Sequence, residues 1–392
     1  MTRRTPPLDV MIVGAGITGL ALGLVLHQKG VRVKVIDRRP LPEFAAPAGF
    51  DQRIYAMSLA SEAFLRRAGG WQDMDQARIQ PILGMKVRGD RDGRLSLAPN
   101  RGQTAPMGWI VEAGAMLSAL HRHQTKVAPE LLETGLTVSA IHEQDSALEV
   151  CLSRGQSWQT RLLVAADGIH SDLRERFGIP AHFSPYGHRA IVANYRISGQ
   201  HGGVARQWFV PGEVIALLPL VGQHVSLVWS AQGDHAQALL AMSPVQRAQA
   251  LQQQVGYELG LLEEISVPAD FELRRMDVAR WIAPRFALVG DAAHGVHPMA
   301  GQGLNLGLQD AACLAETLIG RGPGPDCGDR SLLRRYERAR REPVAVMQGL
   351  TGGLAHVFSA SRQRWGWARN WGMNRLERCS WLKDELVRYA NR

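Results

Sequence analysis

A glycine-rich turn between a strand and a helix constrains the fold of this 392-residue chain more than any other feature. Apolar residues 9–13 predict a short buried strand, and the turn Gly14-Ala15-Gly16-Ile17-Thr18-Gly19 follows directly. A helix then runs to Gly30, and the alternating valines of residues 31–36 predict a second strand. A strand, a glycine turn, a helix and a second strand together indicate a βαβ unit at the start of the chain.

Each glycine of the turn has a separate role in this interpretation. Gly14 permits the tight turn, Gly16 lets a pyrophosphate approach the backbone, and Gly19 allows the helix to pack closely on the strand. The free N–H groups and the dipole of the helix N-terminus favour the anion. Asp37 ends the second strand 23 residues after Gly14, where an acid can accept a hydrogen bond from a ribose hydroxyl. The turn predicts a bound dinucleotide but does not distinguish FAD from NAD(P).

Two further strand-like runs also end in an acid. Residues 161–166 lead into Asp167, within Ala166-Asp167-Gly168-Ile169-His170-Ser171-Asp172-Leu173-Arg174. Residues 286–289 lead into Gly290-Asp291, and a loop containing Pro298 then enters a helix through Gly301 and Gly303. Glycines there let backbone N–H groups approach a flat ring, and the helix N-terminus stabilises negative charge on a reduced flavin. The late loop therefore favours FAD.

Residues 185–275 have a different pattern from the rest of the chain. Short strand-like runs at 190–198, 205–210, 214–220 and 225–230 are broken by Gly and Pro. They predict an antiparallel sheet inserted into a nucleotide-binding domain that is discontinuous in sequence. From Ser331 onward the pattern is helical. The predicted fold class is therefore α/β.

Taken together, the three motifs resemble those of the FAD-dependent aromatic hydroxylases with the para-hydroxybenzoate hydroxylase fold. Finer features are similar to the UbiH/COQ6-type ubiquinone-biosynthesis hydroxylases within these class A flavin monooxygenases. These features are Arg53-Ile54-Tyr55-Ala56-Met57-Ser58, Trp109-Ile110-Val111-Glu112, Leu217-Leu218-Pro219-Leu220 and His297-Pro298-Met299-Ala300-Gly301-Gln302-Gly303-Leu304-Asn305. The resemblance implies a GR2-type Rossmann-like FAD-binding domain of residues 1–80, 105–180 and 276–340. Residues 81–104 and 181–275 would form the substrate domain with the inserted sheet, and 341–392 a C-terminal helical segment.

The resemblance also implies roles for individual residues. The FAD-binding residues would be Gly14, Gly16 and Gly19 at the pyrophosphate, Asp37 at the adenosine ribose, Arg53 at the phosphates or flavin, Asp291 at the ribityl chain, and Gly301, Gly303, Leu304 and Asn305 at the pyrimidine end of the flavin. Asp167 would serve both the pyrophosphate and the reduced nicotinamide through the loop that it organises. Pro298 would lie beside the reacting face of the flavin. The substrate ring is expected near Leu217, Leu218, Pro219 and Leu220, and the sequence identifies no general base.

The implied activity is hydroxylation of the aromatic ring of a polyprenyl phenol or quinol in ubiquinone biosynthesis. NAD(P)H would be a transient reductant, and O₂ would form a flavin hydroperoxide that transfers the hydroxyl group. Two alternatives stay open. One is a flavin hydroxylase of a soluble phenol or secondary metabolite, and the other is a non-catalytic FAD-binding accessory protein of a quinone-synthesis complex. Oxidation of NADPH coupled to a hydroxylated product would exclude the accessory protein.

Basic charge is concentrated near the C-terminus. The net charge is +9, and residues 321–392 hold 15 Lys and Arg against 7 Asp and Glu. The nearly neutral remainder excludes a uniformly basic nucleic-acid-binding protein. Residues 361–392 contain four of the ten tryptophans, interleaved with arginines. They indicate either an amphipathic helix covering the core or a surface for anionic lipid or a quinone-synthesis partner. In the second case we expect salt-sensitive binding to anionic vesicles that truncation after Ala360 abolishes.

The remaining features predict a protein of a reducing compartment without a metal. The four cysteines lie far apart and include no CxxC pair. His294 and His297 are three residues apart, but no further ligand accompanies them, so we expect them to hydrogen-bond within their loop. The apolar run 10–26 is too short and too rich in glycine for a membrane span. We expect a cytoplasmic protein, with peripheral contact at the inner face of the membrane as an open alternative.

Overall fold

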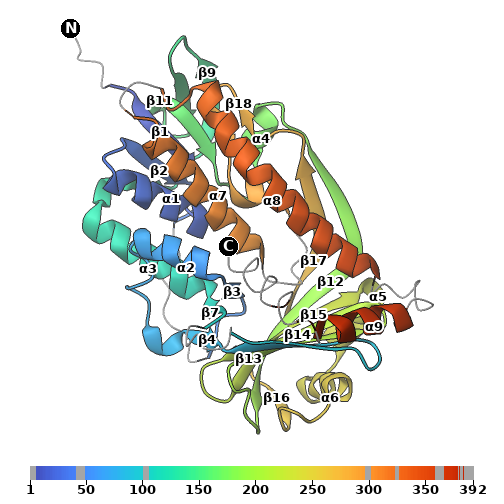
Figure 1. Cartoon of the computed structure of the whole chain (residues 1–392). Coiled ribbons are helices and arrows are strands. Elements are labelled where there is room, and N and C mark those ends of the chain that lie inside the picture. The colour runs from blue at the N-terminus through green and yellow to red at the C-terminus, as the bar shows by residue number, and fades with distance from the viewer. Residues whose placement is uncertain are drawn as a thin grey trace.

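The computed structural model describes residues 6–40, 49–99, 106–295, 302–322, 326–357, 366–377, 379 and 383. Within these ranges the strands form two eight-stranded sheets and one three-stranded sheet. In Figure 1 the first sheet lies in the upper left of the view beside α1 (Ile17–Gln28), α7 (Gln302–Ile319) and α8 (Arg330–Val357). The second sheet fills the lower right, and its longest strands reach up toward the first sheet.

The first sheet has a parallel centre, with the hydrogen-bonded order β18-β19-β11-β1-β2-β8. Its central strands pair in parallel, whereas β9 and β10 extend from β11 as antiparallel strands. Val10, Met11 and Ile12 of β1 have no exposed surface, as expected for a parallel strand covered on both faces. The strands are β1 (Leu8–Val13), β2 (Val33–Asp37), β8 (Leu132–Thr134), β9 (Val138–Glu143), β10 (Leu148–Leu152), β11 (Ser157–Ala165), β18 (Ile282–Ala283) and β19 (Phe286–Leu288).

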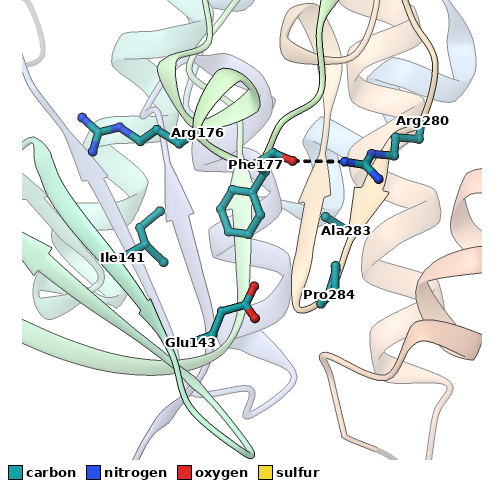
Figure 2. A pocket seen from close by; sticks show the side chains of 7 residues that line it. All are labelled: Ile141, Glu143, Arg176, Phe177, Arg280, Ala283 and Pro284. Atoms are coloured by element: carbon teal, nitrogen blue, oxygen red, sulfur yellow. Dashed lines mark hydrogen bonds between the residues drawn. The ribbon is translucent and has the colours of Figure 1, made fainter.

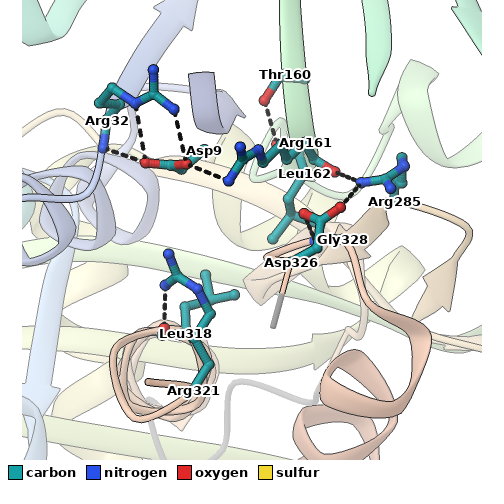
Figure 3. A network of polar contacts seen from close by, with 10 residues as sticks. All are labelled: Asp9, Arg32, Thr160, Arg161, Leu162, Arg285, Leu318, Arg321, Asp326 and Gly328. Atoms are coloured by element: carbon teal, nitrogen blue, oxygen red, sulfur yellow. Dashed lines mark hydrogen bonds and ion pairs between the residues drawn. The ribbon is translucent and has the colours of Figure 1, made fainter. Parts of the chain in front are cut away.

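Ion pairs fasten the amino-terminal side of this sheet (Figure 3). Asp9 at the start of β1 accepts hydrogen bonds from the side chains of Arg32 and Arg161, with N–O distances of 3.4–3.5 Å. Arg285 donates to the carbonyl oxygen of Arg161 at 3.0 Å and pairs with Asp326 at 2.6 Å. Contacts at this edge hold the strands in register. The three sequence motifs lie at the other edge, where each follows the carboxyl end of a strand.

The second sheet is antiparallel except for one parallel pair, β5 with β13. Its order is β16-β12-β15-β14-β13-β5-β6, and β17 pairs with β12. One face packs its apolar side chains on α5 (Gly233–Ala241) and α6 (Pro244–Val255) in a separate core. The strands are β5 (Gly84–Arg88), β6 (Arg94–Leu97), β12 (Ala181–Ile197), β13 (Val204–Val210), β14 (Glu213–Leu220), β15 (His224–Gln232), β16 (Leu262–Glu264) and β17 (Ala269–Val278).

Helix α9 (Gly366–Glu377) covers the edge of the second sheet at β6. Side chains of Asn370, Asn374 and Glu377 accept hydrogen bonds from the backbone N–H groups of Gly93, Arg94 and Ser96, at 2.7–3.0 Å. Unpaired edge N–H groups invite pairing with another chain, so α9 protects this edge. This part of the C-terminal segment therefore has a structural role, while Trp371 on its outer side is 57% exposed.

The three-stranded sheet has the order β3-β7-β4 and was not predicted. It consists of β3 (Ile54–Met57), β4 (Gln80–Ile82) and β7 (Gly108–Glu112). The remaining elements are α2 (Leu59–Arg67), α3 (Ala113–Val127), α4 (Asp172–Arg176) and the 3₁₀ turns Gln76–Arg78, Pro129–Leu131 and Gly290–Ala292. None of the described helices is both long and apolar enough to cross a bilayer.

The strands predicted at 9–13, 31–36, 161–166, 205–210, 214–220, 225–230 and 286–289 are confirmed within a few residues. The strand predicted at 190–198 is present as well, but β12 begins nine residues earlier, at Ala181. The α/β class with its inserted, largely antiparallel sheet is also confirmed. The division into numbered domain ranges remains our proposal. Because β4 pairs with β7, we propose to place the first boundary after Ile82 instead of after residue 80. Because β17 continues to Val278, the insertion would end there instead of at residue 275.

Candidate cofactor and substrate site

The three motifs meet at one edge of the first sheet. Gly14 follows β1, Asp37 ends β2, Asp167 follows β11 and Gly290 follows β19. These four strands are neighbours in the order β19-β11-β1-β2, and all run parallel. Open α/β sheets bind ligands at the carboxyl ends of their strands, so this edge is the candidate cofactor site.

The three glycines of the turn have measurably different surroundings. A Cβ atom on Gly14, whose φ is +110°, would lie 2.2 Å from the carbonyl oxygen of Ala166. On Gly19 it would lie 2.0 Å from the carbonyl oxygen of Gly14, so both glycines are required by the fold itself. On Gly16 it would meet nothing within 4 Å. The space beside Gly16, at the N-terminus of α1, thus fits a pyrophosphate that approaches the backbone.

Asp37 lies against the glycine turn. Its Oδ2 accepts a hydrogen bond from the backbone N–H of Ala15 at 2.8 Å, and Oδ1 accepts one from that of Arg39 at 2.9 Å. Asp37 is partly exposed and holds the turn in place. A carboxylate oxygen can accept more than one hydrogen bond, so these contacts leave capacity for a ribose hydroxyl.

A buried acid fixes the Gly290–Asp291 turn from below. Asp310 of α7 has no exposed surface, and its Oδ2 accepts hydrogen bonds from the N–H of Gly290 at 3.1 Å and from His294 Nε2 at 2.6 Å. Its Oδ1 accepts from Arg340 Nε of α8 at 2.7 Å. Burial alone would raise the pKa of Asp310, but His294 and Arg340 outweigh it and hold the pKa below its usual range. The carboxylate is therefore ionised and anchors both ends of the turn. His294 bonds to α7, which corrects the expectation of a partner within its own loop.

Asp291 itself faces outward from this anchored turn. Its side chain is reached by solvent although protein surrounds it, as in the wall of a recess. Enclosure by protein raises the pKa of Asp291, the charge of Asp310 adds to the rise, and His294 and Arg53 oppose it. A carboxylate in this position suits the hydroxyl groups of a ribityl chain, which would replace the hydrogen bonds of water.

Arg174 joins the second and third motifs. The side chain is 1% exposed, and Nη1 donates to the carbonyl oxygens of Ile169 and Ala292, both at 3.1 Å. Asp167 lies beside Gly14, since the missing Gly14 Cβ would be 2.8 Å from the Asp167 nitrogen. Burial raises the pKa of Asp167, and its Oδ1 is buried without a hydrogen-bond partner among the described residues. An unpartnered buried acceptor beside the phosphate turn is consistent with a ligand or water there.

Arg53 and Tyr55 reach the same region from β3 and the segment before it. Burial raises the pKa of Tyr55, with the charge of Asp291 adding to the rise and that of Arg53 opposing it. Arg53 is exposed, and its charge acts on both Tyr55 and Asp291. Asp51 fixes the backbone here by accepting from the N–H groups of Arg53 at 3.0 Å and Gly114 at 2.8 Å. The charge of Arg53 therefore acts at Asp291, where a cation could also bind the negatively charged cofactor.

The residues at the start of α7 have separate positions. Asn305 is fully buried, and its amide bonds to the backbone of β3 and α2, through the carbonyl of Ala56 at 2.8 Å and the N–H of Ser58 at 3.0 Å. Its side chain therefore docks the helix instead of pointing into an open site. Gly303 and Leu304 are partly exposed in the first turn of α7. Pro298, Gly301 and His297 lie outside the described residues.

The four residues expected at the substrate lie on alternate faces of β14. Leu217 is 1% exposed and packs in the core toward α5 and α6. Leu218 pairs across the sheet with Ser226, which in turn pairs with Asn194. Asn194 donates to the carbonyl of Asp51 at 3.0 Å, so the Leu218 face is turned to the segment that precedes Arg53. Successive side chains point to opposite faces, so Leu218 can face a substrate there and Leu217 cannot.

A separate pocket lies at the C-terminal end of α4, between Arg176, Phe177 and Pro284 (Figure 2). It is lined by Ile141, Glu143, Arg176, Phe177, Arg280, Ala283 and Pro284. Arg280 donates to the carbonyl oxygen of Phe177 at 3.2 Å, and Arg176 donates to that of Ser139 at 2.8 Å. Its two arginines bond to the backbone of β9 and of the C-terminal end of α4, and no lining residue belongs to the three motifs. In the described ranges, no three His, Cys, Asp or Glu side chains come together as a metal site requires.

Comparison with known proteins agrees with this geometry. The model of the family described as FAD binding domain matches residues 7–348. The chain belongs to this family. It is 36% identical to the ubiquinone hydroxylase UbiL of Rhodospirillum rubrum, over 97% of this chain and 89% of that protein. It is also 29% identical to the 3-demethoxyubiquinol 3-hydroxylase of Escherichia coli, over 98% of both chains. The p-nitrophenol 4-monooxygenase PnpA of Pseudomonas putida shares the fold, with a TM-score of 0.77, 18% identity and 98% coverage of both chains.

The protein is accordingly an FAD-dependent monooxygenase, and its cofactor is FAD. Bound FAD supplies the redox chemistry. The described groups that fit FAD by position and charge are the backbone of the glycine turn and the side chains of Asp37, Arg53, Asp167 and Asp291. Sequence reasoning did not assign roles to Asp310, Arg340 and Arg174. The sequence did contain one signal. Asp310 is followed by Ala311 and Ala312 in a largely apolar helix, and an acid buried in such a helix needs a partner.

Replacing Asp291 by alanine is expected to weaken FAD binding by one to two orders of magnitude. A hydrogen bond to a charged group contributes about 1.5–3 kcal/mol, and the carboxylate already faces solvent, so the apoprotein should fold normally. The measurement is the FAD dissociation constant of refilled apoprotein, with Asp172→Ala as a control on an exposed acid of α4. If a folded Asp291→Ala protein binds FAD as tightly as the wild type, Asp291 does not contact the cofactor.

Proposed function

We propose that this monooxygenase hydroxylates the aromatic ring of a polyprenyl phenol or quinol in ubiquinone biosynthesis. The observation that supports it most is the 36% identity to a ubiquinone hydroxylase over nearly the whole length of both chains. The partly exposed apolar side chains of Ala216, Leu218 and Val228, on the sheet face turned toward the Arg53 segment, are suited to such a ring. A peripheral contact with the membrane, where a polyprenyl substrate resides, is part of the proposal.

In this proposal the chain's own residues bind, orient and exclude water. The backbone around Gly16 would hold the pyrophosphate, and Asp37 and Asp291 would hold the two sugar portions of FAD. Arg53 would balance the negative charge of the cofactor beside Asp291. Leu218 and its neighbours would keep the ring in an apolar, dry space, which strengthens electrostatic interactions there. Bound FAD, reduced by NAD(P)H, would activate O₂ and supply the hydroxyl group.

Complementation tests the proposal directly. Bacterial strains that each lack one quinone-ring hydroxylase would receive this chain, and the accumulated intermediates would be identified by mass spectrometry. We expect ubiquinone to be restored in at least one strain, and the missing activity in that strain identifies the ring carbon. Purified protein should couple NAD(P)H oxidation to a hydroxylated product. Restored ubiquinone without such coupling would support a non-catalytic FAD-binding accessory protein. Turnover of soluble phenols alone would support a flavin hydroxylase of a soluble phenol or secondary metabolite.

Two adjacent leucines distinguish the two faces of β14. Leu218→Trp is expected to reduce hydroxylation at least tenfold while leaving FAD content and thermal stability nearly unchanged, since it adds bulk on the partly exposed face. Leu217→Ala is expected to lower the free energy of unfolding by about 2–5 kcal/mol, because it opens a cavity in the core toward α5 and α6. Steady-state turnover and urea unfolding are the measurements. If Leu218→Trp turns over substrate normally, this face does not bind the ring.

A further inference from the structure

A row of exposed arginines runs along one face of α8. Arg330, Arg334 and Arg338 follow one another at four-residue intervals, and all three are exposed. None of them has an ion pair or hydrogen bond with a described residue, and the same is true of exposed Arg335 and Arg341. Residues four apart on a helix are neighbours, and like charges at this spacing are destabilising. The protein alone therefore gains nothing from this arrangement.

The first three arginines also surround a hollow in the surface. Arg330, Ser331, Arg334 and Arg338 line one pocket, so three arginine side chains lie around a single place. Guanidinium groups bind phosphate oxygens through paired N–H donors. Three such side chains around one hollow are suited to a phosphate group.

Three acids lie near the row of arginines, and two of them accept hydrogen bonds from backbone groups. Asp329 accepts a hydrogen bond from the backbone N–H of Ser331 at 2.7 Å, at the start of α8. Glu337 accepts one from the backbone N–H of Trp281 at 2.8 Å. Glu342 is exposed and lies four residues after Arg338, so the two side chains are neighbours on the helix. No ion pair joins any of these acids to Arg330, Arg334 or Arg338 in the part of the chain that the structure describes, so the three guanidinium groups can bind an external anion.

The length of the row favours a surface over a small ligand. From Arg330 to Arg341 the helix rises by about 16 Å, at roughly 1.5 Å per residue. A single phosphate would occupy only the pocket, whereas repeated anionic groups would use the whole row. Resting on the proposed function, which places the substrate in a bilayer, we propose that Arg330, Arg334 and Arg338 bind the phosphodiester groups of an anionic lipid surface.

Vesicle binding by the FAD-loaded full chain tests this proposal. The probes are vesicles of phosphatidylglycerol with phosphatidylcholine, and of phosphatidylcholine alone, in co-sedimentation at low and high salt. The test variant carries Arg330→Gln, Arg334→Gln and Arg338→Gln. The control carries Lys29→Gln, Lys126→Gln and Arg154→Gln, which removes the same charge from exposed positions on other elements. We expect the test variant to bind anionic vesicles roughly 100-fold more weakly, at about fivefold per cation near the surface, and the control to bind almost normally.

Four outcomes would overturn the proposal. Equal losses of vesicle affinity in the test and control variants would indicate a general effect of net charge. Unchanged vesicle affinity in the test variant would show that the contact lies on another surface. Absence of vesicle binding by the unmodified chain would exclude the lipid. Calorimetric binding of inorganic phosphate at the pocket without vesicle binding would show a small-anion site instead. FAD content and turnover of a short-chain quinol in detergent are measured in parallel, so that failure of the lipid contact is distinguishable from failure of the proposed hydroxylation.

Discussion

Replacing Asp310 by alanine is expected to lower the free energy of unfolding by about 3–5 kcal/mol, because removing one partner leaves the other charge buried and uncompensated. Here that partner is Arg340, which is 7% exposed and has its Nε 2.7 Å from Asp310. The same substitution removes the acceptor of the Gly290 N–H and of His294. We therefore also expect FAD affinity to fall at least tenfold, although Asp310 itself is fully buried beneath the turn. Urea unfolding and FAD titration are the measurements.

A matched control for this effect is Glu263→Ala. Glu263 pairs with Arg196 at the surface, where both side chains are about 60% exposed, and such pairs contribute at most about 1 kcal/mol. The pH dependence provides a second check. The pKa of Asp310 is lower in the folded than in the unfolded protein, so its contribution is present above about pH 4 and is lost as the pH falls through the folded-state pKa. A difference between wild type and Asp310→Ala that stays constant down to pH 2 would contradict this assignment.

Two glycine substitutions should separate the fold from the cofactor. Gly16→Ala is expected to leave the thermal stability of the apoprotein nearly unchanged, since its new Cβ meets nothing within 4 Å and the backbone there is extended. FAD affinity should nevertheless fall about 10- to 100-fold, the equivalent of one charge-assisted hydrogen bond. Gly14→Ala should instead destabilise the apoprotein itself, because its Cβ would lie 2.2 Å from a carbonyl oxygen and φ is +110°.

Calorimetry of the two apoproteins and FAD titration of the folded ones measure this separation. An exposed glycine, Gly155, gives a further comparison, because it has a positive φ of +75° but no neighbour within 4 Å. Gly155→Ala should cost some stability through backbone strain without affecting FAD. If Gly16→Ala binds FAD as tightly as wild type, the cofactor does not approach the backbone at this turn.

Local pattern predicted much of the fold. The βαβ unit and the strands of the insertion follow from valine alternation, glycine turns and short apolar runs, and α1, β2, β13, β14 and β15 lie close to their predicted positions. The three-stranded sheet was missed because β3, β4 and β7 are three to five residues long and pair across large sequence separations. The parallel pairing of β5 with β13 likewise depends on tertiary contacts that no local signal carries.

The site was predictable where a motif requires a particular residue, and less so where packing decides. The steric requirement at Gly14 and Gly19 follows from the glycine motif and agrees with the structure, whereas the contact of Asp291 with the ribityl chain stays a prediction. The opposite orientations of Leu217 and Leu218 needed the strand register, because the sequence gives two apolar neighbours no sign of which faces the core. Arg174 could not be assigned from sequence, since its acceptors at residues 169 and 292 belong to different motifs.

The strand order of the first sheet has a consequence for synthesis. β1 and β2 are complete by residue 37, but β19 ends at residue 288 and Arg340 follows later still. At roughly 5–20 residues per second, about 15–60 s separate translation of the first βαβ unit from that of Arg340. Until residue 165 has been translated, the apolar edge of β1 has no β11 beside it, and β11 in turn waits for β19. The strand edge that holds the three motifs is therefore complete only late in synthesis, so FAD can stabilise the finished sheet but not its first unit alone.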